Sequence, residues 1–251
     1  MSGWLSLSEA RERNGLRVVL MRGFPSPWSQ AAKAILHVKG IPYLACAPGE
    51  GDEPGALPDW TGQNSYPAAM YEDEAPRSGW AEILLLAERL APDPPLIPKD
   101  PARRALCFGI AHEICGEMGL GWCRRLCAIH AGYCADPPDP MARWLGDKYG
   151  YRPDAHAVAE QRVVEVLGLL SDSLRANGGA YLLGELSALD LYWATFCNLI
   201  SPLPPEQLPL PEAMRSMFTA IEPAVCDALT PELEALRDRV YERHLVLPVE
   251  L

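Results

Sequence analysis

Ser26 stands out as the residue whose type and surroundings suit chemistry. It lies in the turn 23–27 (GFPSP), directly before a predicted helix at 28–39. A hydroxyl hydrogen bond to an anion is worth about 1.5–3 kcal/mol, and a helix N-terminus adds about 0.3–1 kcal/mol. Ser26 is therefore a candidate for stabilising a bound anion. As an alternative, its hydroxyl caps the helix by bonding the backbone N–H of residue 28 or 29, and Ser29 offers a second hydroxyl nearby.

Polar residues before a tyrosine–proline pair form the next candidate group. A cis bond between Tyr66 and Pro67 would turn the backbone of residue 66 outward, where an extended peptide ligand could pair with it. An ordinary trans proline opening an edge strand is the alternative. Gln63 and its neighbours Asn64 and Ser65 could donate to a ligand carboxylate, or they could simply be polar loop residues.

The elements that position these residues follow from the apolar patterning. Short apolar runs at 17–21 and 41–47 predict strands on either side of the helix at 28–39, which ends at Gly40. Strands joined by a helix lie parallel with a right-handed crossover. An irregular loop, a hairpin with Glu72–Asp73 at its turn and another helix are then expected at 48–65, 67–77 and 80–90.

The rest of the chain has helical patterning. The segment 91–101 holds five prolines, and it is interpreted as a linker between a first domain at 1–92 and a second at 101–251. The DPPDP sequence at 136–140 interrupts the pattern. Helices are predicted at 102–133, 154–176, 188–200, 212–221 and 231–243.

Charge and hydropathy exclude several classes of partner. The formal net charge is −11, which disfavours binding to nucleic acid and to anionic lipid. No apolar run approaches the ~20 residues that a membrane span needs. Residues 1–15 lack the apolar core of a signal peptide, so a cytoplasmic protein is expected.

The eight cysteines are expected to be free thiols, because nothing in the sequence indicates secretion. Cys123, Cys127 and His130 fall on one face of a predicted helix at positions i, i+4 and i+7, a spacing that could ligate a metal. Without a partner cluster elsewhere in the chain, free core thiols are the favoured interpretation. No metal is predicted.

In its order of elements and in three local motifs, the chain resembles the soluble glutathione transferases and looks like a divergent, bacterial-type member. The motifs are Ser26-Pro27-Trp28 before the first helix, Tyr66-Pro67 opening the hairpin, and Ser187-Ala188-Leu189-Asp190 as a helix cap. Each is weak alone, but they occur in the family's order across almost the whole chain.

The resemblance implies an α+β domain of thioredoxin-like fold that binds glutathione, followed by an all-α helical bundle. Ser26 would face the glutathione sulfur and stabilise its thiolate, with Ser29 as the other candidate hydroxyl. The glutathione-binding residues would be Trp28, Gln63, Tyr66, Pro67, Ser78 and Gly79. Glutathione would be a co-substrate without a metal, and a homodimer with a role in detoxification is expected.

A second substrate is also implied, a small hydrophobic electrophile. In the family it binds against the first long helix of the second domain. Here that helix offers an apolar wall, with the alternative that these side chains are core: Cys107, His112, Cys115, Met118, Trp122 and Cys123. Trp28 would face this wall.

One departure from the family pattern concerns the helix at 80–90. The family has a Glu-Ser pair where this chain has Ser78-Gly79 or, with a shift of one residue, Arg77-Ser78. Ser78 could still offer its N–H to a carboxylate. The second hypothesis is therefore a non-catalytic ligand- or protein-binding module with a degenerate glutathione site. A thiol oxidoreductase is disfavoured, because the turn before the first helix contains no cysteine.

Overall fold

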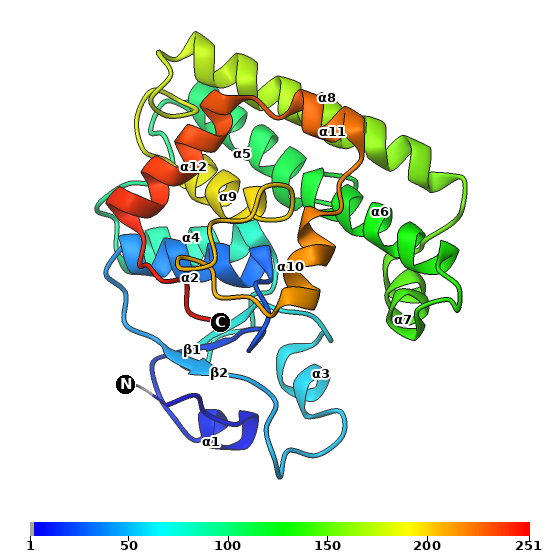
Figure 1. Cartoon of the computed structure of the whole chain (residues 1–251). Helices are drawn as coiled ribbons and strands as arrows, with labels where there is room; N and C mark the ends of the chain where they lie inside the picture. Colours follow the sequence, from blue (N-terminus) through cyan, green and yellow to red (C-terminus); the bar gives the residue numbers. More distant parts are fainter. Residues whose placement is uncertain (1–2) are drawn as a thin grey trace. The chain divides into compact units, whose positions relative to one another are not determined.

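The protein divides into two compact units in a computed structural model that describes residues 3–251 (Figure 1). One unit runs to Leu96 and includes Leu251, and the other spans Ile97–Glu250. The division falls inside the proline-rich segment 91–101, although the last residue groups with the first unit. Within the described residues, no helix is both long and apolar enough to cross a membrane.

The first unit is built on a small mixed sheet in the order β2-β1-β3. Its strands are β1 Leu16–Val19, β2 Leu44–Cys46 and β3 Ala68–Tyr71. β2 runs parallel to the central β1 and β3 runs antiparallel to it. The predicted strand–helix–strand unit with parallel strands is therefore confirmed. All four residues of β1 are buried, as is usual for a central strand.

Helices α2 Pro27–Val38 and α4 Trp80–Leu90 match their predicted ranges closely and pack against each other. The interpretation of 48–65 as irregular was wrong in part, because it contains α3 Ala56–Thr61. α1 Leu7–Arg11 was not predicted. Its signal was present: Ser6 and Glu9 form a capping box in which Glu9 Oε2 accepts from the Ser6 N–H at 2.8 Å.

The predicted hairpin at 67–77 is only half formed. β3 is its first strand, but the return is a single antiparallel bridge between Ala69 and Arg77, with N–H···O distances of 2.8 and 2.9 Å. The next hydrogen-bonded pair would join Tyr71 and Ala75, but the Tyr71 carbonyl accepts from the Glu74 N–H at 3.0 Å, so the pairing ends at the turn. Glu72 in that turn has a positive φ of 47°.

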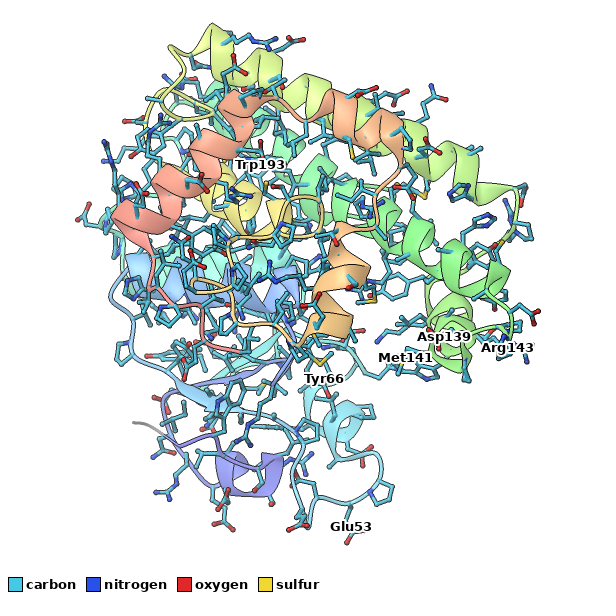
Figure 2. All side chains as sticks on the ribbon, in the orientation of Figure 1. Glu53, Tyr66, Asp139, Met141, Arg143 and Trp193 are labelled. Atoms are coloured by element: carbon cyan, nitrogen blue, oxygen red, sulfur yellow. The ribbon has the colours of Figure 1, made fainter. Side chains whose placement is uncertain are left out.

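The second unit is helical. Its helices are α5 Pro101–Cys115, α6 Leu120–Cys134, α7 Pro140–Tyr149, α8 Ala155–Ala176, α9 Ala188–Cys197, α10 Glu212–Thr219, α11 Pro223–Ala228 and α12 Pro231–His244. α9 is buried on every side, and α5 and α12 pack against it. Trp193 (Figure 2) is fully buried there and donates its indole N–H to the Leu233 carbonyl at 2.8 Å.

The single helical stretch predicted at 102–133 is wrong, because the chain breaks between α5 and α6. A Cβ on Gly119 would lie 2.7 Å from the Glu113 carbonyl oxygen, and one on Gly116 would lie 2.8 Å from that of His112. Met118 between them has φ of 57°. The close backbone approach at the two glycines turns the chain and starts a new helix.

Two further helices were missed, and both open with proline. α7 follows Asp139-Pro140, in which Asp139 Oδ1 accepts from the Met141 N–H at 2.9 Å. α11 opens with Pro223. The predicted break at 136–140 is thus also a helix start, since proline suits the first turn of a helix.

The predicted cap at Ser187–Asp190 is confirmed and is buried. Asp190 Oδ2 accepts from the N–H and the hydroxyl of Ser187, both at 2.9 Å, and Oδ1 accepts from the Leu182 N–H at 2.8 Å. Burial raises the pKa of Asp190 to about 6, although these hydrogen bonds act in the opposite direction. The carboxylate therefore joins the loop before α9 to the start of the core helix.

Replacing Asp190 by Ala is expected to destabilise the protein strongly. The change leaves two backbone N–H groups buried without acceptors, each at a cost of about 1–3 kcal/mol. Urea unfolding should show the loss as a lower midpoint. Asp172→Ala, at an exposed position of α8, is the matched control. An equal effect of the two substitutions would contradict the assigned role of Asp190.

The raised pKa of Asp190 predicts a pH effect of definite sign. A carboxyl whose folded pKa lies above its unfolded value stabilises the fold most at low pH, and this contribution is lost as pH rises from about 4 to 6. Relative to Asp190→Asn, which does not titrate, the wild type should gain about 1 kcal/mol of unfolding free energy between pH 7 and pH 5. Parallel pH profiles for the two proteins would refute this.

Candidate functional site

The strand register gathers several predicted site residues at one end of the sheet. Val19 at the end of β1 lies opposite Cys46, which ends β2, and opposite Ala68, which begins β3. The segment leading from β1 to Ser26 and the Pro67 that precedes β3 therefore leave the sheet at the same end. Opposite strand directions on the two sides of β1 produce this convergence.

Ser78 and Gly79 belong to the same end of the first unit. Ala69 pairs with Arg77 in antiparallel fashion, so the residues after Arg77 run back toward the start of β3. Gly79 is then the N-cap of α4. The register thus directs the α4 N-terminus toward the Pro67 end of the sheet. The segment that leads to the α2 N-terminus leaves the sheet at the same end.

Ser26 occupies the N-cap position of α2, but its side chain makes no capping hydrogen bond. The alternative in which the hydroxyl bonds the N–H of residue 28 or 29 is therefore wrong. The helix forms its first turn through the backbone, with the Gln30 N–H bonding the Ser26 carbonyl at 2.9 Å, and Pro27 supplies the fixed φ of the first position. The Ser26 side chain is 6% exposed and its hydroxyl is not committed to the helix.

Ser29 has a different position. Its Oγ accepts from the backbone N–H of Met21 at 3.1 Å, and the residue is fully buried. This bond ties the segment after β1 to α2. The Ser29 hydroxyl is therefore engaged within the unit, whereas that of Ser26 makes no capping bond.

The Tyr66–Pro67 peptide bond is cis, as the resemblance implied. Tyr66 (Figure 2) is half-buried and packs against a core cluster that includes Val19, Cys46 and Ala68. Burial raises the pKa of the Tyr66 phenol. Residue 66 is thereby fixed by packing at the end of the sheet.

Gln63 does not present its amide to a ligand. Its Nε2 donates to the Ser65 carbonyl and its Oε1 accepts from the Ser65 N–H, both at 2.6 Å. The Thr61 hydroxyl donates to the Gln63 carbonyl at 2.8 Å. The amide therefore shapes the loop before Tyr66, so the predicted carboxylate donor is engaged within the chain.

The two amides at the start of α4 already hold a carboxylate. Glu82 Oε2 accepts from the N–H of Ser78 at 3.1 Å and from that of Gly79 at 2.9 Å. Ser78 and Glu82 are exposed. The chain's own carboxylate thus occupies the position where the sequence placed a ligand carboxylate. The G-x-x-E spacing of a capping box was the signal that sequence reasoning missed.

Half of the residues predicted for the apolar wall on α5 and α6 are core, whereas His112 is exposed and Met118 is partly buried. Cys107, Cys115 and Cys123 are buried, and burial raises the pKa of Cys123 to about 11 and that of Cys115 well above its usual value. Trp122 is partly buried and packs edge-on against Tyr149 of α7, with ring centroids 4.7 Å apart. Trp28, in the first turn of α2, is also partly buried.

All eight cysteines are free, as expected. The side chains of Cys123, Cys127 and His130 do not converge, which agrees with the favoured interpretation of free thiols. The Cys123 thiol donates to the Met118 carbonyl, with Sγ 3.3 Å from the oxygen, and His130 Nδ1 lies 2.7 Å from the Tyr151 hydroxyl. Cys127 lies instead near His156 and Glu222.

A small mixed sheet flanked by helices, followed by a helical unit, defines the class of a thioredoxin-like domain joined to an all-helical domain. Solved structures match over nearly the whole chain. A glutathione transferase family member from Pseudomonas fluorescens, with two glutathione molecules bound, has 12% identity and a TM-score of 0.64, covering 94% of both chains. A glutathione transferase from Pseudomonas putida with glutathione disulfide bound has 14% identity and a TM-score of 0.63, covering 95% of both.

A glutathione transferase from Methylobacterium radiotolerans, in complex with glutathione sulfonate, has 18% identity and a TM-score of 0.60, covering 91% of both chains. No protein-family model and no curated protein matches the sequence. The chain has the fold of the glutathione transferases, so the predicted fold class and the resemblance at the level of fold are confirmed.

Proposed function

We propose that this protein binds glutathione and uses the Ser26 hydroxyl to stabilise its thiolate for attack on a small apolar electrophile. The observation that carries the proposal is the Ser26 side chain, which lies at the N-terminus of α2 without a capping bond. The structural neighbours that were crystallised with glutathione support the choice of ligand.

The energetics of this step are adequate. A free thiol has a pKa of about 8.5, and lowering it by ~2 units requires about 2.7 kcal/mol. A hydroxyl donating to the thiolate supplies about 1.5–3 kcal/mol, and the N-terminus of α2 adds about 0.3–1 kcal/mol. The thiol proton passes to solvent, so no ionised base is needed. The sulfur then forms a bond to the electrophilic carbon, and the electron pair of the bond that breaks there departs with the leaving group or, in a conjugate addition, moves onto the acceptor, which takes a proton from solvent.

The wider setting is part of the same proposal. The enzyme acts as a homodimer in the cytoplasm, in detoxification, with glutathione as co-substrate and without nucleic-acid or membrane partners. The net charge of −11 supports the exclusion of polyanionic partners.

The contribution of Ser26 is tested by comparing Ser26→Ala with Ser29→Ala. We expect Ser26→Ala to raise the pKa of bound glutathione by about 1–2 units, because one charge-assisted bond is lost. Titration of the thiolate absorbance in the near ultraviolet measures this shift. The electrophile-conjugation rate at neutral pH should fall with it.

Ser29→Ala should act on stability instead, because it leaves the partly buried Met21 N–H without its acceptor, at about 1 kcal/mol. The thiol pKa should be unchanged in this variant. A bound thiol that keeps the wild-type pKa in Ser26→Ala would reject Ser26 as the activating group.

A second candidate function is a non-catalytic binding module, and the Glu82 contacts favour it. Two amides at the α4 N-terminus are engaged by Glu82. A ligand carboxylate would have to displace that carboxylate and would meet its negative charge. In this case the protein binds a ligand that lacks a carboxylate at this position, or binds glutathione only weakly and without turnover.

Glu82→Ala tests whether the Glu82 carboxylate obstructs glutathione binding. Turnover of an electrophile by this variant favours the enzyme, and tighter binding without turnover favours the binding module. Removing the carboxylate frees the Ser78 and Gly79 amides, and we expect the glutathione dissociation constant to fall by about tenfold, since a charge-assisted bond is worth about 1.5–3 kcal/mol. Calorimetric titration measures it. Glu9→Ala, which removes the equivalent cap at Ser6 on α1, is the matched control and should leave binding unchanged.

The opposite result is equally informative. Weaker binding by Glu82→Ala would mean that Glu82 itself contacts the ligand. No binding of glutathione by the wild type or by Glu82→Ala would reject glutathione as the ligand altogether.

A further inference from the structure

Three metal-ligating side chains converge in the second unit, and none of them belongs to the proposed thiol site. Cys127 lies in α6, His156 in the first turn of α8, and Glu222 is the N-cap residue of α11. One ligand atom from each lies within 4.8 Å of the other two. α6 and α11 both pack against α8, which holds the three elements together.

We propose that Cys127, His156 and Glu222 form a zinc-binding site. A thiolate, an imidazole and a carboxylate are the ligand types that Zn²⁺ takes in proteins. Bonds of about 2.0–2.3 Å in a tetrahedral site place ligand atoms about 3.3–3.7 Å apart. The group must therefore contract by about 1 Å. His156 and Glu222 are only partly buried, so rotation of their side chains can supply this movement.

The surroundings orient two of the three ligands. The His130 ring stacks on that of His156, with centroids 4.0 Å apart and planes inclined by 17°. The buried Arg124 donates through Nη1 to the Glu222 carboxylate. A carboxylate can accept from arginine with one oxygen and ligate a metal with the other. Such outer contacts fix ligand geometry in metal sites.

The charges at the site change when the ion binds. Without a metal, the Cys127 thiol keeps its proton, because burial raises its pKa to about 12 and Glu222 acts in the same direction. On binding, the thiol proton leaves to solvent and the thiolate sulfur bonds the ion. Two anionic ligands then face the dication, and the field of Glu160, one helical turn after His156, adds to them.

Three protein ligands leave one position of a tetrahedral ion for water or another small ligand. Cys127 also belongs to the group whose helical spacing could ligate a metal. In the structure its neighbours are His156 of α8 and Glu222 at the start of α11, not Cys123 and His130. It lies wholly within the second unit and uses neither Ser26 nor the α4 N-terminus. The inference is thus independent of the proposed glutathione chemistry.

The test is a cobalt titration of the full-length protein after removal of metals with a chelator. Co²⁺ serves as a spectroscopic substitute for Zn²⁺. We expect one equivalent to bind, with a sulfur-to-cobalt charge-transfer band and the strong visible bands of a tetrahedral site. Zinc should displace the cobalt and abolish both.

Variants assign the ligands. Cys127→Ser should remove the charge-transfer band, and His156→Gln should weaken cobalt binding by more than about tenfold. Cys226→Ser and His244→Gln alter a thiol of α11 and a histidine of α12 outside the group, and they should bind as the wild type does. Circular dichroism and thermal unfolding without metal establish whether each variant is folded.

Three results would overturn the site. The first is no cobalt binding by the wild type at a moderate excess of metal. The second is wild-type binding by His156→Gln, a partly buried position where the substitution leaves the core intact. A charge-transfer band that persists in folded Cys127→Ser would likewise assign the sulfur to another cysteine and reject the site.

Discussion

The pairing of β1 with strands of opposite direction is the constraint on which the candidate site depends. β2 runs parallel to β1 and therefore ends beside it, whereas β3 runs antiparallel and begins there. The segment carrying Ser26 and the Tyr66–Pro67 pair consequently meet at one end of a sheet whose central strand is fully buried. A register shift of one residue would turn every side chain of β3 to the other face, so burial also fixes the register.

Elements with a strong local signal were predictable from the sequence. α2 and α4 have regular apolar spacing, and the Ser187–Asp190 cap has the spacing of a capping box. The break between α5 and α6 was not predictable, because it arises from the approach of Gly116 and Gly119 to backbone carbonyls that only the folded turn brings near. The missed helices α1 and α7 had readable caps in Ser6–Glu9 and Asp139–Pro140, but their helices are short and weakly apolar.

The candidate site shows a different limit. The sequence singled out the turn before α2, the Tyr66–Pro67 pair and the start of α4, and the strand register brings these segments to one end of the sheet. Their hydrogen-bond partners were not predictable, because several acceptors compete for each donor over short distances. Gln63 bonds Ser65, Glu82 takes the amides of Ser78 and Gly79, and Ser26 leaves its helix uncapped. Only the structure decides which competitor is engaged.

The distribution of sulfur and hydroxyl groups fits a protein that acts on a thiol brought by a ligand. Six of the eight cysteines are buried, and burial raises the pKa of Cys46 and Cys197 to about 12. A protonated thiol is a poor nucleophile, so these residues pack as small apolar groups. Cys127, which lies near His156 and Glu222, needs a cation to lose its proton. The proposed thiolate chemistry of the first unit therefore relies on an external sulfur, for which the uncapped Ser26 hydroxyl is our candidate partner.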